Sequence, residues 1–165
     1  MGETHGRGSS HPSPHPDTPI HSMHEDIELP KDRIPALRVE TMPSDTNQNG
    51  DVFGGWIMSQ VDLAGANTAM RYALSRFIVT RAISSLTFEA PVMVGDVVSF
   101  YTEIVKIGRT SITVKVEVFA ERLTKRWNNI AKITEAELVY VALGPDKKPI
   151  PLEESRANFT KFCPL

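Results

Sequence analysis

Histidine is absent from most of this 165-residue chain. All five histidines lie within the first 24 residues, at His5, His11, His15, His21 and His24. The rest of the chain therefore has no means of building a Ser-His-Asp triad, a Cys-His pair or a histidine-ligated zinc site. A metal-binding role for the histidine-rich N-terminus itself is the less favoured alternative to a plain polar tail.

The chain also has little cysteine, no long apolar run and only a small net charge. The single cysteine, Cys163, has no partner for an internal disulfide, so a cytoplasmic location is the default expectation. No run of about 18 apolar residues predicts a membrane span, and the N-terminus lacks the apolar region of a secretory signal. A net charge of −2 provides no overall basic field. We therefore expect neither nucleic acid nor membrane as a partner.

The composition divides the chain into two tails and one domain. Residues 1–25 hold several prolines, glycines and serines and almost no apolar side chains, which predicts a disordered N-terminal tail. Residues 26–152 form the expected domain, because a chain of this length suits one hydrophobic core. Residues 153–165 predict a short polar C-terminal tail, with helical character from Glu153.

One long helix is predicted after Gly54-Gly55. The stretch from Trp56 to about Ser75 contains no proline and carries apolar residues at mixed helical spacing. Small residues fill its middle, which allows a sheet to approach closely. These small residues are Ala64, Gly65, Ala66 and Ala69.

The remaining pattern is that of extended strands. One short strand is predicted over residues 34–41, and four longer ones over residues 77–88, 97–107, 110–118 and 130–143. Residues 110–118 alternate between apolar and polar with a period of two. Gly95-Asp96 and Gly108-Arg109 mark turns between strands.

The order of these elements predicts an α+β fold with one antiparallel sheet. Connections of hairpin length join antiparallel neighbours. A single helix covers only one face of five strands, so the remaining apolar surface and the sheet edges require a partner. We therefore expect a homo-oligomer.

The polar segment before the helix matches the opening of a calcium-binding EF-hand loop, at Asp45, Asn47, Asn49 and Gly50. Such a loop requires a bidentate glutamate at its twelfth position. Trp56 occupies that position here. We therefore expect no metal site in this segment.

The same segment carries a resemblance to a known family. Residues 42–62, with the sequence MPSDTNQNGDVFGGWIMSQVD, strongly resemble the hotdog-fold acyl-CoA thioesterases. The block looks most similar to the YciA-like branch, which is related to the cytosolic acyl-CoA hydrolases. Weaker matches are Phe88-x-x-Pro91, Gly95-Asp96 and residues 108–111. The resemblance covers roughly residues 34–152 and excludes both tails.

The resemblance implies a hotdog fold, in which a long central helix is wrapped by a five-stranded antiparallel sheet. It also implies dimers joined edge to edge, commonly assembled into homohexamers as trimers of dimers, with active sites at the dimer interface. The implied activity is hydrolysis of acyl-CoA to free coenzyme A and a carboxylic acid, a reaction of fatty acid metabolism. No cofactor is expected beyond the coenzyme A of the substrate.

Asp62 matches the position of the family's catalytic carboxylate. Aspartate is a poor residue for the middle of a helix, so its place among small and apolar residues needs a reason. The pattern alone also allows a solvated side chain on the exposed face. In the implied mechanism Asp62 is either a general base that activates water or a nucleophile that forms a mixed anhydride.

Gly54 and Gly55 lie where the predicted helix begins. Unpaired N–H groups at a helix N-terminus would stabilise the oxyanion that develops during thioester hydrolysis. The resemblance implies that Gly55 is the main donor. It also implies that Asn47 reaches across the dimer interface to orient water or the thioester carbonyl. Asn49 competes for that role, and an ordinary turn asparagine is the alternative.

Coenzyme A carries several phosphate charges, which cations and hydroxyl donors would meet. The candidates are Arg109, Thr110, Ser111 and, more weakly, Lys115 and Arg81. An ordinary solvated turn is the alternative for this group. Aromatic residues either shape the acyl-chain site or belong to the core. The aromatic candidates are Phe53, Trp56 and Phe88.

Two other functions remain as alternatives. Hydratases and dehydratases resemble the hotdog fold but rely on a catalytic histidine, which this domain lacks. A non-catalytic acyl-CoA-binding hotdog module is the second alternative. No helix-turn-helix segment or basic patch indicates DNA binding. Release of free thiol from acyl-CoA distinguishes an enzyme from a binding module.

Overall fold

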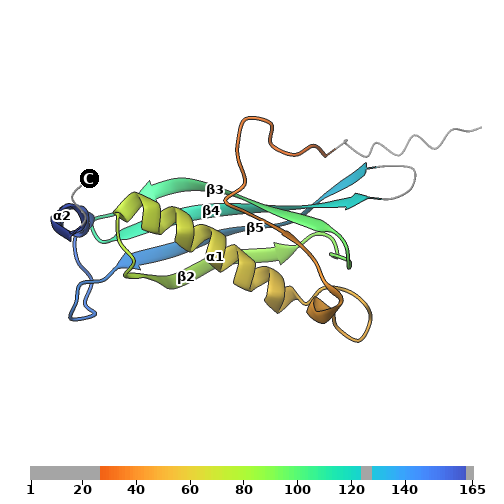
Figure 1. Ribbon diagram of the computed structural model, residues 1–165, viewed down its shortest axis with the longest axis horizontal. Coiled ribbons are helices and arrows are strands. Elements are labelled where there is room, and N and C mark those ends of the chain that lie inside the picture. Colours follow the sequence, from red (N-terminus) through yellow and green to blue (C-terminus); the bar gives the residue numbers. More distant parts are fainter. Residues whose placement is uncertain (1–26, 124–127, 163–165) are drawn as a thin grey trace, which may run out of the picture.

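Five strands and one long helix make up most of the molecule (Figure 1). The computed structural model describes residues 27–123 and 128–162. The elements are β1 (Leu37–Glu40), η1 (Pro43–Asp45), α1 (Gly54–Ala73), β2 (Ile78–Phe88), β3 (Val97–Ile107), β4 (Ser111–Leu123), β5 (Asn128–Ala142) and α2 (Leu152–Phe162). The strands form one antiparallel sheet in the order β1-β3-β4-β5-β2. The predicted fold class is confirmed.

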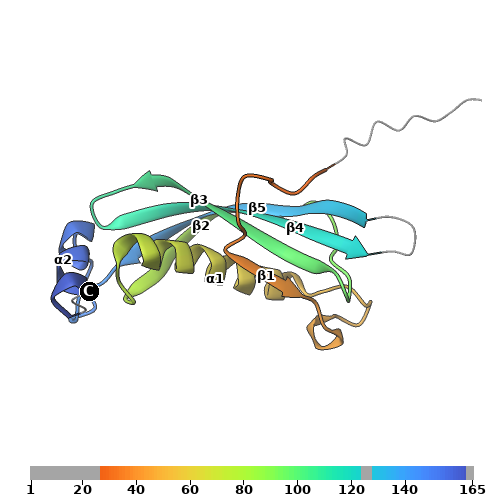
Figure 2. The same cartoon turned by 45° about the horizontal axis from the view of Figure 1, so that its top comes forward.

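Helix α1 lies across one face of the sheet and supplies the centre of the core (Figure 2). Its buried residues recur at helical spacing: Ile57, Val61, Ala64, Gly65, Ala69 and Ala73. They form one cluster with inward-facing sheet residues such as Val98, Phe100, Val114, Val116 and Leu138. The small residues in the middle of α1 allow close packing, as predicted: a Cβ added to Gly65 would lie only 2.2 Å from the Tyr140 hydroxyl oxygen.

Strand β1 is shorter than the predicted segment of residues 34–41. It begins at Leu37, which lies opposite Phe100 of β3. Pro35 has no N–H to donate to a neighbouring strand, which accounts for the late start.

The sequence also left the strand order undefined: β2 pairs with the last strand, β5, so that Ile78 lies opposite Ala142.

Strand β2 forms one edge of the sheet and is largely exposed. Nine of its eleven residues are exposed in the single chain. They include Val79, Ile83 and Phe88, whose exposed fractions are 42%, 43% and 44%. An open edge with apolar side chains is a surface that proteins normally cover. This exposure supports the expectation of a homo-oligomer.

The face of the sheet opposite α1 is polar and contacts the segment that precedes β1. Arg33 donates to Glu117 at 2.5 Å and lies over the Tyr101 ring, 5.6 Å from its centre. Tyr101 in turn meets Phe119 edge to face, with ring centres 5.8 Å apart. The chain before β1 therefore covers part of the face that α1 leaves open.

Helix α2 packs against the C-terminal end of α1 (Figure 2). Leu152 belongs to the core, and the Ser155 hydroxyl donates to the carbonyl oxygen of Ala73 at 3.2 Å. The helical character expected from Glu153 is confirmed. The tail expected over residues 1–25 lies outside the described residues. In the described part of the chain, no helix combines the length and apolarity needed to cross a membrane.

Candidate active site

The carboxylate of Asp62 is held by hydroxyl groups from two strands. The Thr80 hydroxyl of β2 donates to Asp62 Oδ1 at 2.5 Å. The Tyr140 hydroxyl of β5 lies 3.0 Å from the main-chain oxygen of Asp62 and 3.4 Å from Oδ1. Asp62 is half-buried rather than exposed on the outer face of α1. The alternative of a simply solvated aspartate therefore does not describe this side chain.

Gly65 makes the contact between Tyr140 and Asp62 possible. Any side chain at this position would collide with the Tyr140 hydroxyl, because even a Cβ would lie 2.2 Å from its oxygen. Burial, together with the adjacent Asp62 carboxylate, raises the pKa of the Tyr140 phenol well above its ordinary value. Tyr140 therefore stays protonated near neutral pH and remains a hydrogen-bond donor to Asp62.

The N-terminus of α1 has unpaired donors. The N–H groups of Trp56 and Ile57 both donate to the carbonyl of Phe53, at 3.0 and 3.2 Å. Those of Gly54 and Gly55 have no acceptor among the residues that the structure describes. Space around Gly55 is open, since a Cβ there would meet nothing within 4 Å. The helix thus presents free donors at the positive end of its dipole.

Asn47 bonds within its own loop. Its Oδ1 accepts the N–H groups of Asn49 at 2.8 Å and Asp51 at 3.2 Å. Its main-chain N–H donates to the Asp51 carbonyl at 2.8 Å. These bonds are those of a turn asparagine, and they leave the side-chain NH₂ as the group available for another contact. They also engage the Asn47 oxygen that the calcium alternative would have required.

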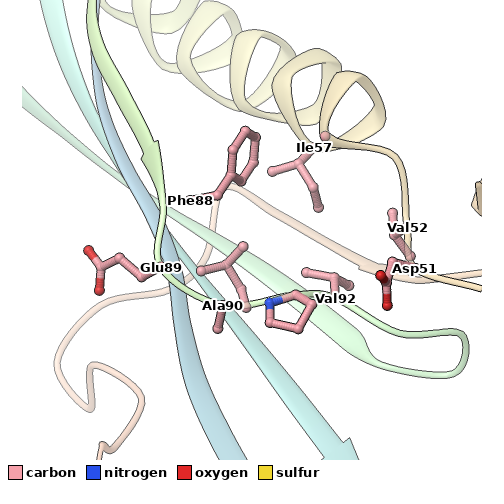
Figure 3. Close-up of a pocket in the computed structure, with 10 residues that line it drawn as sticks. Asp51, Val52, Ile57, Phe88, Glu89, Ala90 and Val92 are labelled. Atoms are coloured by element: carbon pink, nitrogen blue, oxygen red, sulfur yellow. The ribbon is translucent and has the colours of Figure 1, made fainter. Parts of the chain in front are cut away.

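An apolar cavity of about 350 Å³ opens beside the start of α1 (Figure 3). Figure 3 shows Phe88 and Ile57 on one side of it and Ala90 on the other, and Pro91 also lines it. Further lining residues are Asp51, Val52, Gly54, Glu89, Val92 and Ile133. Of the three aromatic candidates, Phe88 lines this cavity, whereas Phe53 precedes the helix and Trp56 packs against the core.

The turn before β3 is held by a buried carboxylate next to this cavity. Asp96 is 1% exposed and accepts two hydrogen bonds from Arg122, at 2.9 and 2.7 Å. It also accepts the N–H of Met93 at 2.9 Å. The hydrogen bonds to Asp96 raise the pKa of the Arg122 guanidinium. The Asp96–Arg122 pair therefore fixes the segment that supplies Val92 to the cavity wall.

The residues predicted to meet coenzyme A lie in three different places. Arg109 lines a second cavity of about 480 Å³ together with Tyr72, Gly108 and Arg156. Thr110 and Ser111 follow Arg109 at the start of β4, and Arg81 is exposed on β2. Lys115 instead lies on the sheet face opposite α1, with ion pairs to Glu135 at 3.0 Å and Glu117 at 4.0 Å.

Sequence reasoning missed Thr80 and Tyr140 as partners of Asp62. Both lie in strands that were predicted, but their proximity depends on the pairing of β2 with β5. A single sequence carries no local signal for that pairing. Within the described residues, no group of three or more His, Cys, Asp or Glu side chains is arranged to hold a metal ion.

Comparison with known proteins identifies the family. The model of the thioesterase superfamily matches residues 49–125. The acyl-CoA thioester hydrolase YciA of Salmonella typhimurium is 48% identical over 117 residues, which cover 70% of this chain and 87% of that protein. The Escherichia coli YciA protein is 44% identical over 120 residues, covering 71% of this chain and 90% of that protein.

Solved structures agree with the sequence comparison. A hexameric hotdog-fold thioesterase of Campylobacter jejuni superposes with a TM-score of 0.69 at 41% identity, covering 76% of this chain and 95% of that one. The fold and the site thus define a hotdog-fold thioesterase. The chain belongs to the family of YciA acyl-CoA thioester hydrolases. The resemblance and the hotdog fold predicted from the sequence are confirmed.

Proposed function

We propose that this protein hydrolyses the thioester of acyl-CoA, with Asp62 as the catalytic carboxylate and Gly55 as the main oxyanion donor. The observation that carries the assignment is the placement of Asp62, whose carboxylate is held by Thr80 and whose helix turn is held by Tyr140. The family supports the reaction class, since its YciA members are named acyl-CoA thioester hydrolases.

Two chemical routes are open to Asp62. As a general base it accepts a proton from water, and the resulting hydroxide attacks the thioester carbonyl. As a nucleophile its carboxylate attacks the carbonyl directly, forming a mixed anhydride that water then hydrolyses. In both routes the carbonyl oxygen becomes negative, N–H donors stabilise it, and coenzyme A leaves as the thiolate. Neither route requires a metal or another cofactor.

One copy of the chain does not supply a complete site for this reaction. Gly55 and Asp62 are seven residues apart in α1, which places them about 10 Å apart along the helix axis. A reacting carbonyl must lie about 3 Å from both the attacking group and the oxyanion donor. We therefore place Gly55 of one copy opposite Asp62 of another, with the NH₂ group of Asn47 contributed from the same side as Gly55.

The remaining parts of the proposal concern substrate and assembly. Arg109, with Thr110 and Ser111, would contact the phosphates of coenzyme A. The assembly would be a homodimer or a trimer of dimers, in line with the hexameric state of the Campylobacter thioesterase. The exposed edge of β2 is the surface available for joining two copies. A cytoplasmic location completes the proposal.

The catalytic assignment is tested by Asp62→Asn. This change keeps the size of the side chain and its hydrogen bonding to Thr80 but removes the base and its charge. Loss of a general base costs roughly 10²–10⁴ in rate, so kcat for a short acyl-CoA should fall by that factor. The matched control is Asp146→Asn, in an exposed turn where Asp146 accepts the N–H of Lys148. If correctly assembled Asp62→Asn keeps the kcat of the control, Asp62 is not catalytic.

The shared site is tested by mixing two inactive proteins. Asp62→Asn and Asn47→Ala subunits are denatured, mixed and reassembled together. Each mixed pair would contain one site with both groups intact and one with neither, so activity should return. Each variant reassembled alone provides the reference. Activity no higher than the sum of the two references would show that Asn47 acts within its own copy or not at all.

A further inference from the structure

The two hydroxyl groups near the Asp62 carboxylate come from paired positions on neighbouring strands. Thr80 of β2 lies directly opposite Tyr140 of β5 in the sheet. Just beyond this pair, the register of β2 shifts between Thr80 and Ala82. Irregularities of this kind redirect side chains and are frequent next to active sites. The pairing of β2 with β5 therefore sets the relative position of the two hydroxyl groups.

The two carboxylate oxygens of Asp62 have different surroundings. Oδ1 accepts the Thr80 hydroxyl at 2.5 Å and lies 3.4 Å from the Tyr140 hydroxyl oxygen. Oδ2 accepts no hydrogen bond from any residue that the structure describes. Among the described side chains, only the hydroxyls of Ser99 and Thr134 are buried without a partner, so Oδ2 is open to solvent. Oδ2 is therefore the oxygen that water or substrate can approach.

Tyr140 contacts both the main chain and the side chain of Asp62. Its hydroxyl donates to the Asp62 main-chain oxygen at 3.0 Å, in addition to lying near Oδ1. The Tyr140 side chain is completely buried and belongs to the core cluster. Gly65 closes the space on the helix side, since an added Cβ would also lie 3.0 Å from two ring carbons of Tyr140. A ring packed in this way moves little, so its hydroxyl is a fixed donor.

From this geometry we propose that Tyr140 is a positioning residue, which orients Asp62 so that Oδ1 is held and Oδ2 reacts. The inference rests on the proposed thioesterase function. In the general-base route, Oδ2 accepts one proton of water while the water oxygen bonds to the acyl carbon. In the nucleophilic route, Oδ2 itself bonds to the acyl carbon. In both routes the C–S bond breaks and its electron pair leaves with the thiolate of coenzyme A. Tyr140 keeps its proton and acts only through Asp62.

The first test is Tyr140→Phe, which removes one oxygen atom and keeps the ring in the core. Thiol release from a short acyl-CoA is measured on the assembled protein. We expect kcat to fall about tenfold, because the carboxylate loses a fixed donor and spends less time in the reactive orientation. KM should stay within about twofold of wild type, because Tyr140 does not contact the substrate.

The matched control is Tyr101→Phe. Tyr101 is also buried, with an exposed fraction of 3%, but it lies on the opposite face of the sheet, where its ring packs against Phe119. Its hydroxyl makes no hydrogen bond with the described residues. The control should therefore keep the wild-type kcat. Gly65→Ala serves as a second variant, because its Cβ forces the Tyr140 hydroxyl away from Asp62 without removing it, and it should also lower kcat.

A double-mutant cycle tests whether Tyr140 acts through Asp62. In the Asp62→Asn protein no carboxylate remains to be oriented, so adding Tyr140→Phe should not lower the residual kcat any further. Sedimentation and urea unfolding of each variant show whether it assembles and folds as the wild type does.

Three outcomes would overturn the inference. One is a wild-type kcat in assembled Tyr140→Phe, and another is an equal fall in kcat in the Tyr101→Phe control. The third is a full additional loss of kcat when Tyr140→Phe is combined with Asp62→Asn, which would mean that Tyr140 acts independently of the carboxylate. A wild-type kcat in Asp62→Asn alone would instead contradict the proposed function.

Discussion

The two ends of α1 differ in whether their main-chain groups are capped. At the C-terminal end, side chains of α2 cover the last carbonyl groups: Ser155 donates to Ala73 at 3.2 Å and Arg156 Nε donates to Tyr72 at 2.9 Å. At the N-terminal end no side chain caps the helix, and the N–H groups of Gly54 and Gly55 have no acceptor among the described residues.

Under the proposed mechanism, the capped end of α1 is structural and the open end binds the substrate. Unpaired main-chain groups at a helix end cost stability, so proteins normally satisfy them with caps. Here the capped end is anchored to the core through Leu152, and the open end adjoins the apolar cavity. In the proposed mechanism, the oxyanion of the substrate provides the acceptor that these open donors lack.

The strongest test of this contrast is Gly55→Pro. Proline is tolerated in the first turn of a helix, but it has no N–H. Loss of one oxyanion donor should lower kcat by roughly 10²–10³ while the protein still folds and assembles. Gly55→Ala is the matched control, because it keeps the N–H and its Cβ meets nothing within 4 Å. Equal losses in kcat for the two variants would remove Gly55 from the oxyanion site.

A mutation at the capped C-terminal end of α1 should lower the stability of the protein rather than its kcat. Ser155→Ala leaves the buried Ala73 carbonyl without its hydroxyl donor, which should lower the free energy of unfolding by about 0.5–1.5 kcal/mol. The measurement is urea unfolding, with Ser44→Ala, at an exposed serine, as the reference. A fall in kcat without a fall in stability would show that α2 takes part in function, against the contrast drawn above.

The smallest effect is expected at Leu74, which follows α1 with a left-handed φ of 50°. Glycine adopts this conformation without steric cost, whereas alanine keeps the Cβ atom that causes the steric cost. The free energy of unfolding should therefore be about 1 kcal/mol higher for Leu74→Gly than for Leu74→Ala. The two variants should have equal kcat. If Leu74→Ala is the more stable of the two, backbone strain at this cap is negligible.

Much of the fold could be predicted because it depends on local pattern. The lack of proline and the apolar spacing predict helix α1, and the period of two predicts strand β4. The candidate site was predicted in part: Asp62, Gly54 and Gly55 follow from one continuous block of sequence. Thr80 and Tyr140 escaped prediction, since each is an ordinary strand residue until β2 pairs with β5.

The sequence by itself determined the order of the helices and strands and the lack of histidine chemistry in the domain. It also determined that Asp62 lies on a helix that begins with two glycines. Only the tertiary structure decided which groups meet Asp62, which end of α1 stays open and where Lys115 points. The physical reason is that these features depend on contacts between residues far apart in the chain. Tyr140 reaches Asp62 across 78 positions, and Ser155 reaches Ala73 across 82.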